Sequence, residues 1–481
     1  MSAYRGLDHL AADWAGVPDA WLGRAVLEHG VALLLLVALV STINQFPGLL
    51  SSRGLMPIEP YLRQTTFWDR PSVFGWHYTD RFFLGVCWAG VALSALTVAG
   101  VTAMLPAWGH LLVWLAMWVC YLSVVNVGQR WYAFLWEMLL CEVVFICAFI
   151  GPRAEVPSAV VLGALVWLLI RVELGAGLIK MRGGPEWRNL TALDYHHETQ
   201  PMPGPLSWYF HHLPKVLHRV ETGANHVVQL AVPFLLLAPQ PVRSYAALVM
   251  AATQAWLVLS GNFAWVNLLT ICLSLSLVAD SAVGLEGWRP ELAQTPGWML
   301  VVVIGFGVLS LALAWQPLLN LLSRQQKMNA RYNPLLLGSS YGAFGTIGKQ
   351  RRELVLEGSS GPGEPWLEYE FHGKPGDVCV RPPQVAPYHL RLGWQLWFAA
   401  LSPYFRGPWL DKLVVALLRG EPALVRMCRV NPFPDGPPRW IRVVQYDYRY
   451  STRAERRADG AWWVRSNRRE LMPARRLRAD D

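Results

Sequence analysis

The chain has 481 residues, of which 53% are hydrophobic and only 16% are charged, and its formal net charge at pH 7 is +9. Long uncharged stretches in a chain of this composition exclude an ordinary water-soluble globule and indicate a protein that crosses a membrane several times. The positive charge is concentrated near the C-terminus, because residues 324–481 hold 26 Lys and Arg against 15 Asp and Glu.

Six apolar stretches are each close to the ~20 residues that cross ~30 Å of hydrocarbon. They are residues 30–46, 82–105, 111–127, 131–150, 156–179 and 298–322. Three shorter stretches, 226–238, 245–260 and 263–278, are interrupted by Pro, Gly, Asn or Asp, and we expect them to be spans, tilted hairpins or half-buried segments. Residues 1–322 are therefore predicted to form an α-helical polytopic membrane bundle of about six to nine spans. We expect its first stretch to be an uncleaved anchor, because it follows a polar segment and lacks a small-residue cleavage site.

The stretch at 156–179 contains Arg171 and Glu173, and Lys180 follows directly. Charges in or beside hydrocarbon are costly and usually mark a site or are paired. At about 100° per residue, Glu173 and Lys180 lie on nearly the same helix face, roughly 10 Å apart along the axis. Two interpretations of Lys180 remain open. It is either a desolvated amine that acts as a base or nucleophile, or a lysine at a helix end that reaches water.

Two carboxylates, Glu137 and Glu142, lie in the stretch at 131–150. Five residues apart on a helix, they point roughly 140° away from each other and cannot both line one narrow groove. We expect at least one of them to pair with an arginine on a neighbouring span, most simply Arg171. With Glu173, these residues form a predicted intramembrane polar network.

Residues 181–225 are predicted to form a polar loop that is rich in histidine and tryptophan. Its spacings match no helical zinc motif, so neither a metal nor a cofactor is expected. The alternative to a functional site is an interfacial belt, in which aromatic and imidazole rings lie at headgroup depth. The candidate residues in and beside this loop are Trp187, Asp194, His196, His197, Glu198, His211, His212, Asn225 and His226.

Residues 323–481 change in character and are predicted to form a β-rich extramembrane domain with a basic tail. Alternating stretches at 353–356, 366–371 and 440–450 are separated by Gly and Pro clusters, and 395–401 and 410–418 favour short amphipathic helices. The basic run at 468–478 is expected to be solvated and loosely ordered, with contact to anionic headgroups as the alternative. A disulfide between Cys379 and Cys428 requires that this domain face an oxidising compartment.

Several long strings resemble the lipase maturation factor family. They are GAGLIKMRGGPEWRNLTALDYHHETQPMPGPLSWYFHHLP, NHVVQLAVPFLLLAP, QAWLVLSGNFAWVNLLT, RPPQVAPYHLRLGWQLWFAAL, NPFP and IRVVQYDYRY. One departure is that the family commonly reads RLDWQ in the tail, whereas residues 391–395 here read RLGWQ, which lacks the carboxylate.

The resemblance implies a multi-span membrane protein that helps secreted lipases, or related secreted hydrolases, to fold and assemble into their active form. It also implies that the β-rich tail recognises the client on the lumenal side, with Arg391, Trp394, Trp397 and Asn431 as the candidate contacts. The expected partners are therefore a secreted protein client and the lipid bilayer, and not nucleic acid. The expected location is the endoplasmic reticulum membrane in a eukaryote or the plasma (inner) membrane in a bacterium.

A shorter string, AGLIKMRGGPEW, is similar to the corresponding junction of the vitamin K-dependent gamma-carboxylases. In that family a lysine ahead of a tryptophan is the catalytic base, and Lys180 is the matching position. The alternative hypothesis is therefore a membrane enzyme that uses Lys180 as a base with a lipid-soluble cofactor.

Overall fold

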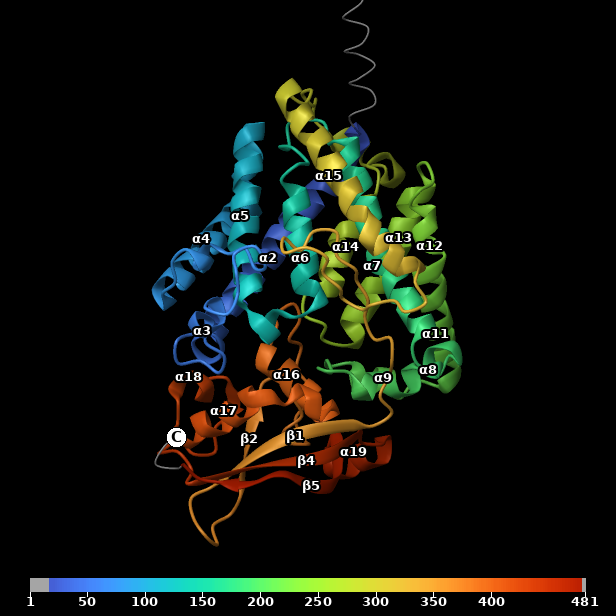
Figure 1. Ribbon diagram of the computed structural model, residues 1–481. Coiled ribbons are helices and arrows are strands. Elements are labelled where there is room, and N and C mark those ends of the chain that lie inside the picture. Colours follow the sequence, from blue (N-terminus) through green and yellow to red (C-terminus); the bar gives the residue numbers. More distant parts are fainter. Residues whose placement is uncertain (1–16, 478–481) are drawn as a thin grey trace, which may run out of the picture.

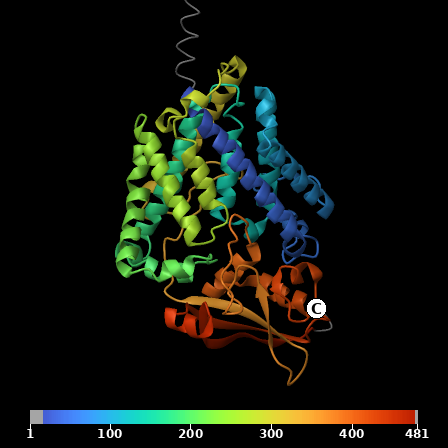
Figure 2. The same ribbon diagram turned by 180° about the vertical axis from the view of Figure 1, so that it is seen from behind.

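The computed structural model describes residues 17–477, which form a helical bundle with a sheet-containing region at one end (Figure 1). Figure 2 shows from behind that the sheet lies beneath the same end of the bundle. Within this described part of the chain, six helices are long and apolar enough to cross a membrane, which confirms the polytopic class. They are α2 (Trp21–Leu49), α4 (Asp80–Val98), α5 (Ala107–Val127), α7 (Ala159–Arg182), α13 (Val242–Ser260) and α15 (Gly297–Leu322).

Two of the six main stretches differ from the prediction. The stretch at 131–150 forms only the 13-residue helix α6 (Leu135–Cys147) after a 3-10 turn (Gln129–Tyr132), and its apolar side chains are buried among other helices. Helix α4 ends at Val98 instead of continuing to 105, because Gly100 adopts a left-handed conformation (φ 79°) and turns the chain. Hydrophobicity alone cannot separate a buried helix from a lipid-facing one.

Shorter helices complete the helical part. The stretches 226–238 and 263–278 hold the end of α11 (Lys215–Leu230), α12 (Val232–Leu235) and α14 (Val266–Leu275), while 245–260 lies within the span α13. The polar residues between α7 and α11 form α8 (Pro185–Arg188), α9 (Leu193–Thr199) and α10 (Ser207–His211), and α3 (Ile58–Leu62) lies between α2 and α4. These loop helices lie at the end of the bundle that faces the sheet (Figure 1).

The C-terminal region contains a five-stranded antiparallel sheet in the order β3-β2-β1-β4-β5. Helix α16 packs between this sheet and the bundle, where the Gln445 amide donates to the Ala400 carbonyl at 2.9 Å. The elements are β1 (Arg351–Ser359), β2 (Leu367–Phe371), α16 (Arg391–Leu401), α17 (Gly407–Leu418), α18 (Pro422–Val425), β3 (Cys428–Val430), β4 (Trp440–Tyr450), α19 (Arg453–Asp459) and β5 (Trp463–Arg475).

The basic segment 468–478 was expected to be loosely ordered, but its residues up to Arg475 belong to strand β5. The strand is stabilised by pairing with β4 and by ion pairs such as Arg468–Glu357 (3.3 Å) and Arg475–Asp411 (2.6 Å). A run of arginines lacks apolar alternation, so its strand character depends on a partner strand that the local sequence does not reveal. Arg478 lies outside the described residues.

Two segments of the C-terminal region enter the bundle. One lies against α7, where a Cβ at Gly175 would stand only 2.3 Å from the Tyr341 carbonyl oxygen, so this close contact needs glycine. The other precedes α16 and passes between α2 and α6, where the His389 carbonyl accepts hydrogen bonds from Ser41 (3.0 Å) and Gln45 (2.7 Å). The two parts of the chain therefore share buried polar contacts.

Candidate functional site

A buried ion pair joins Arg171 on α7 to Glu142 on α6, as the sequence predicts. The Arg171 guanidinium also donates to the Ser339 carbonyl at 2.8 Å, and the Tyr341 hydroxyl donates to Glu142 at 2.6 Å. Both added partners come from the segment that follows α15. This arrangement satisfies the charges and fixes that segment against the bundle.

The second carboxylate, Glu137, pairs with Arg391 at the start of α16. The Tyr121 hydroxyl also donates to Glu137, and His389 Nδ1 lies 3.2 Å from it. The Arg391 guanidinium stacks over the Tyr132 ring at 3.7 Å. Burial, together with the nearby Arg391 charge, lowers the pKa of His389 to about 4, so this imidazole is neutral at pH 7. We call Tyr121, Glu137, His389 and Arg391 the junction cluster.

The four tail residues expected to contact a client lie mostly at this junction. Arg391 and Trp394 are buried, and Trp394 packs against Trp136 with ring centroids 4.7 Å apart. The half-buried Trp397 donates from Nε1 to the Thr199 carbonyl at 3.1 Å and thereby joins α16 to α9. Asn431, also half-buried, hydrogen-bonds the backbone of Phe433 in the turn after β3.

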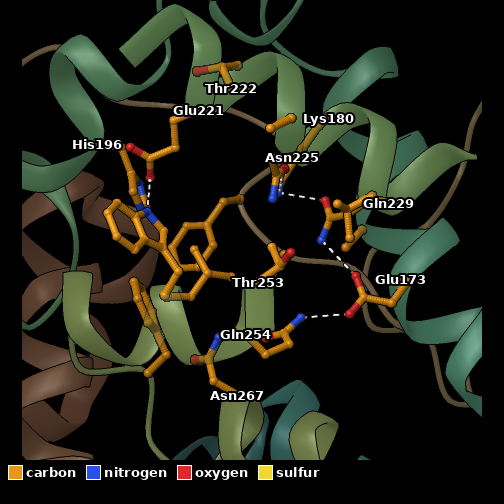
Figure 3. A pocket seen from close by; sticks show the side chains of 18 of the residues that line it. Glu173, Lys180, His196, Glu221, Thr222, Asn225, Gln229, Thr253, Gln254 and Asn267 are labelled. Atoms are coloured by element: carbon orange, nitrogen blue, oxygen red, sulfur yellow. Dashed lines mark hydrogen bonds between the residues drawn. The ribbon is translucent and has the colours of Figure 1, made fainter. Parts of the chain in front are cut away.

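Lys180 and Glu173 line a cavity of about 630 Å³ between α7, α11, α13 and α14. They make no direct ion pair with each other within the described chain, and the amide of Gln229 lies between them. Lys180 Nζ donates to Asn225 and Gln229, both at 2.8 Å, and Gln229 donates to Glu173 at 3.1 Å. This series of hydrogen bonds continues, because Gln254 donates to Glu173 at 2.7 Å and Asn267 donates to Gln254 at 2.8 Å (Figure 3). We call these six residues the amide chain.

Most of the remaining cavity wall is apolar. It includes Val172, Ala176, Val228, Leu257 and Val266, and the Trp187 ring lies 4.6 Å from the Lys180 ammonium. A second cavity of about 680 Å³ lies beside the first and is lined by Arg182, Arg324 and Arg351, among others. A pocket with apolar walls and a few converging polar groups is the usual form of a small-molecule site.

Three histidines in and beside the polar loop, His212, His218 and His226, are held by separate partners. His218 lies 3.1 Å from Asp194, His226 Nε2 lies 2.9 Å from the Trp187 carbonyl, and His212 Nδ1 lies 2.7 Å from the Trp208 carbonyl. Trp187 and Trp208 are buried, so these rings are packed inside the protein and do not form a belt at its surface. Between residues 17 and 477, no three His, Cys, Asp or Glu side chains are placed to hold a metal ion.

Burial shapes the protonation of this loop. It lowers the pKa of His196 to about 3 and that of His211 to about 4, and it holds the pKa of His197 well below its usual range. Glu198 lies 3.6 Å from His211 and accepts a hydrogen bond from the Tyr450 backbone at 2.7 Å, which connects the loop to β4. At neutral pH these three histidines are therefore uncharged packing groups.

Sequence reasoning missed several members of these groups. Gln229, Gln254 and Asn267 are single amides in apolar stretches, and that isolation was a usable signal. Tyr341 and His389 carry no such signal, because they lie in irregular segments whose entry into the bundle is decided by the fold.

Comparisons with known proteins cover both regions of the chain. The model of the lipase maturation factor transmembrane domain matches residues 22–285, and that of the lipase maturation factor C-terminal domain matches residues 337–473. Lipase maturation factor 1 of Mus musculus is 36% identical over 502 residues, which cover 95% of this chain and 88% of the relative.

Two human proteins are also similar along most of their length. Lipase maturation factor 1 of Homo sapiens is 36% identical, and the matched residues cover 92% of this chain and 86% of the relative. Lipase maturation factor 2 of Homo sapiens is 28% identical, and the matched residues cover 94% of this chain and 82% of the relative. No solved structure matches the chain. The alternative of a carboxylase gains no support from these relatives.

Proposed function

We propose that this chain acts on a secreted lipase or a related secreted hydrolase as its client. The chain belongs to the lipase maturation factor family and is a membrane-embedded maturation factor. The observation that carries the proposal is a similarity that extends through both the transmembrane and the C-terminal regions. Relatives that keep both regions together support a function that needs both.

The junction cluster gives a physical reason for that requirement. Arg391 and Glu137 are fully buried and come from different regions, so neither charge is compensated unless the C-terminal region docks on the bundle. We propose that Arg391, Trp394 and Trp397 serve the client indirectly, by holding the sheet in a fixed position at the membrane surface. Asn431 acts in the same way, by fixing the turn that follows β3.

Direct client contacts are proposed for the outer face of the sheet, opposite α16. There the Arg442 guanidinium lies 3.9 Å from the Trp366 ring, and that of Arg465 lies 4.6 Å from the Tyr446 ring. Arginine and aromatic side chains are the types that dominate binding energy at protein interfaces. A partly folded hydrolase with exposed apolar and acidic groups is a suitable partner for such a face.

The proposed location is the endoplasmic reticulum membrane in a eukaryotic cell or the plasma (inner) membrane in a bacterial cell, with the sheet on the extracytoplasmic side. All seven cysteines are free, and Cys379 alone among them is exposed. A membrane-impermeant maleimide should therefore label sealed vesicles that have the extracytoplasmic face outward, and Cys379→Ser should remove the label. Labelling only in vesicles of the opposite orientation would contradict this topology.

The function is tested by co-expression with a secreted lipase in cells that lack their own maturation factor. The full chain should raise the activity per mass of secreted lipase. The double variant Arg442→Glu/Arg465→Glu should lower that gain by about tenfold if these side chains contribute as interface anchors usually do. Lys412→Glu, a single charge reversal at an exposed position of α17, is the control, and each arginine is also reversed singly for comparison with it.

The outcomes separate the parts of the proposal. No gain from the full chain with any of a panel of secreted hydrolases would overturn the client assignment. A gain that survives the double variant at equal protein level would keep the function and reject the outer face as the contact surface.

A further inference from the structure

The cavity beside Lys180 has the chemistry of a site for a single-chain lipid with an acidic head, and this inference does not depend on the identity of the client. We propose that it binds a free fatty acid, with the carboxylate on the Lys180 ammonium and the acyl chain along the apolar wall. The cavity volume of about 630 Å³ lies within the ~300–1,000 Å³ that is common for ligand pockets.

The polar end of the cavity offers donors. An ammonium group has three N–H donors, and Lys180 uses two of them on Asn225 and Gln229. Lys180 is 6% exposed, and its side chain contacts two neutral amides and the Trp187 ring. A carboxylate is the acceptor that forms the strongest hydrogen bond with a desolvated ammonium, because opposite charges strengthen that bond.

The one carboxylate of the amide chain does not already fill this role. Both oxygens of Glu173 accept hydrogen bonds from amides, one from Gln229 and the other from Gln254. Figure 3 shows Gln229 between Glu173 and the Lys180–Asn225 pair. Glu173 is therefore held on the far side of Gln229, and the ammonium keeps its capacity to bind an external acceptor.

His196 provides a second, independent observation. This side chain lines the cavity and is only 7% exposed, yet within residues 17–477 neither of its ring nitrogens has a hydrogen-bond partner. A neutral imidazole carries one N–H donor and one acceptor, both of which a ligand in the cavity can meet. Its position on the wall makes it a further contact for a bound lipid.

The cavity also opens at the protein surface between α11 and the candidate span α13. Leu217 and Val220 on α11 and Trp256 on α13 line the cavity, and these side chains are 48%, 62% and 44% exposed. Residues that line a cavity and also reach the surface mark its mouth. Since this mouth is apolar, an acyl chain would enter sideways from the bilayer between α11 and α13.

Titratable groups around the cavity favour an anionic over a cationic head at the Lys180 end. Glu221 also lines the cavity, but it accepts a hydrogen bond from Trp256 Nε1 at 2.9 Å, and burial raises the pKa of its carboxyl group. An alkylammonium head would be repelled by Lys180. The amine of equal chain length is therefore the specific negative probe.

The test uses the full chain in nanodiscs of neutral phosphatidylcholine with a photoactivatable palmitate. We expect saturable crosslinking that is competed by oleate but not by octadecylamine, with the crosslinked peptides drawn from α11 and α13. Lys180→Met should weaken binding by about tenfold or more, because it removes a charged hydrogen bond. Arg182→Met is the matched control, since it removes a cation two residues away that lines the second cavity.

A second variant guards against a folding defect. Ala252→Trp places a large ring at an exposed position of the cavity wall and should block the acyl chain without touching the amide chain. Unchanged palmitate binding in both Lys180→Met and Ala252→Trp would overturn the proposal, as would equal competition by octadecylamine. Equal binding of palmitate methyl ester would reject recognition of the charge.

Discussion

The junction cluster and the amide chain both contain buried charged residues, but the charges are paired directly in the first and are separated by an amide in the second. In the junction cluster Glu137 and Arg391 meet directly, and the same is true of the neighbouring pair Glu142 and Arg171. In the amide chain Glu173 and Lys180 lie on one helix and reach each other only through Gln229. In the direct pairs each charge is neutralised by its partner within the fold, whereas the amide chain leaves an ammonium group beside a cavity.

This difference separates an architectural role from a binding role. Breaking a direct buried pair leaves the remaining charge without a partner, so such a substitution should destabilise the fold. The amide chain should tolerate the loss of Lys180, because the partners left behind are neutral amides.

The largest effect is expected at the junction cluster. Arg391→Ala leaves Glu137 buried without its cation and should lower the free energy of unfolding by about 3–5 kcal/mol. Thermal unfolding of the purified protein in detergent, followed by tryptophan fluorescence, measures this. Arg63→Ala, which breaks the exposed pair with Glu59, is the control and should change stability by less than about 1 kcal/mol.

A double variant identifies the cause of that loss. Glu137→Leu/Arg391→Met replaces both charges with apolar groups and should recover much of the stability lost in Arg391→Ala. If the double variant is no more stable than Arg391→Ala, the lost stability comes from packing and not from an unpaired buried charge.

The next effect concerns the contact of α7 with the segment that carries Tyr341. Gly175→Ala places a methyl group against the Tyr341 carbonyl and should cost about 1–3 kcal/mol, because the backbone cannot move aside freely. Gly163→Ala on the same helix meets nothing within 4 Å and should be neutral or slightly stabilising. Equal unfolding temperatures for the two variants would show that this contact does not hold the segment in place.

A pH-dependent effect is expected from His197, whose ring nitrogens are buried without partners. Burial holds the pKa of this imidazole well below the ~6.5 of the unfolded chain, so below pH 6.5 the unfolded state binds a proton that the folded state does not. Stability from this group is therefore complete above about pH 7 and falls as the pH is lowered, by about 1.4 kcal/mol at pH 5.5.

The variant His197→Phe should flatten that pH dependence. Urea unfolding at pH 7.5 and pH 5.5 measures the change, and His77→Phe, at an exposed loop position, should leave the profile as it is. A profile that is equally steep in His197→Phe would assign the acid sensitivity to other groups.

The smallest effect on the fold is expected at Lys180. Lys180→Met removes two hydrogen bonds together with the cost of burying the ammonium, so the net change in stability should be about 1 kcal/mol or less. Client activation should persist, because the proposed client contacts lie on the outer face of the sheet and not at this amine. Loss of activation at normal protein level and stability would contradict that expectation and would support Lys180 as a reacting group.

Much of the helical region could be predicted from the sequence, because its signals are local. Long apolar stretches specify helical spans, because apolar side chains are favourable in hydrocarbon and a helix satisfies its own backbone hydrogen bonds there. The stretch 440–450 matches β4 because its residues alternate. The pairing of Arg171 with a glutamate on α6 followed from the cost of an isolated charge. The strand character of the arginine-rich β5 did not follow, because it depends on β4.

The amino-acid pattern is enough to predict that the protein crosses a membrane repeatedly, that a sheet follows the helices, and that the charges near α7 need partners. The identity of those partners follows from the fold alone. Residues separated by more than 200 positions, such as Glu137 and Arg391, meet because segments without secondary structure enter the bundle. No local pattern encodes such a meeting, since each buried charge is compensated only where the fold brings its distant partner to it.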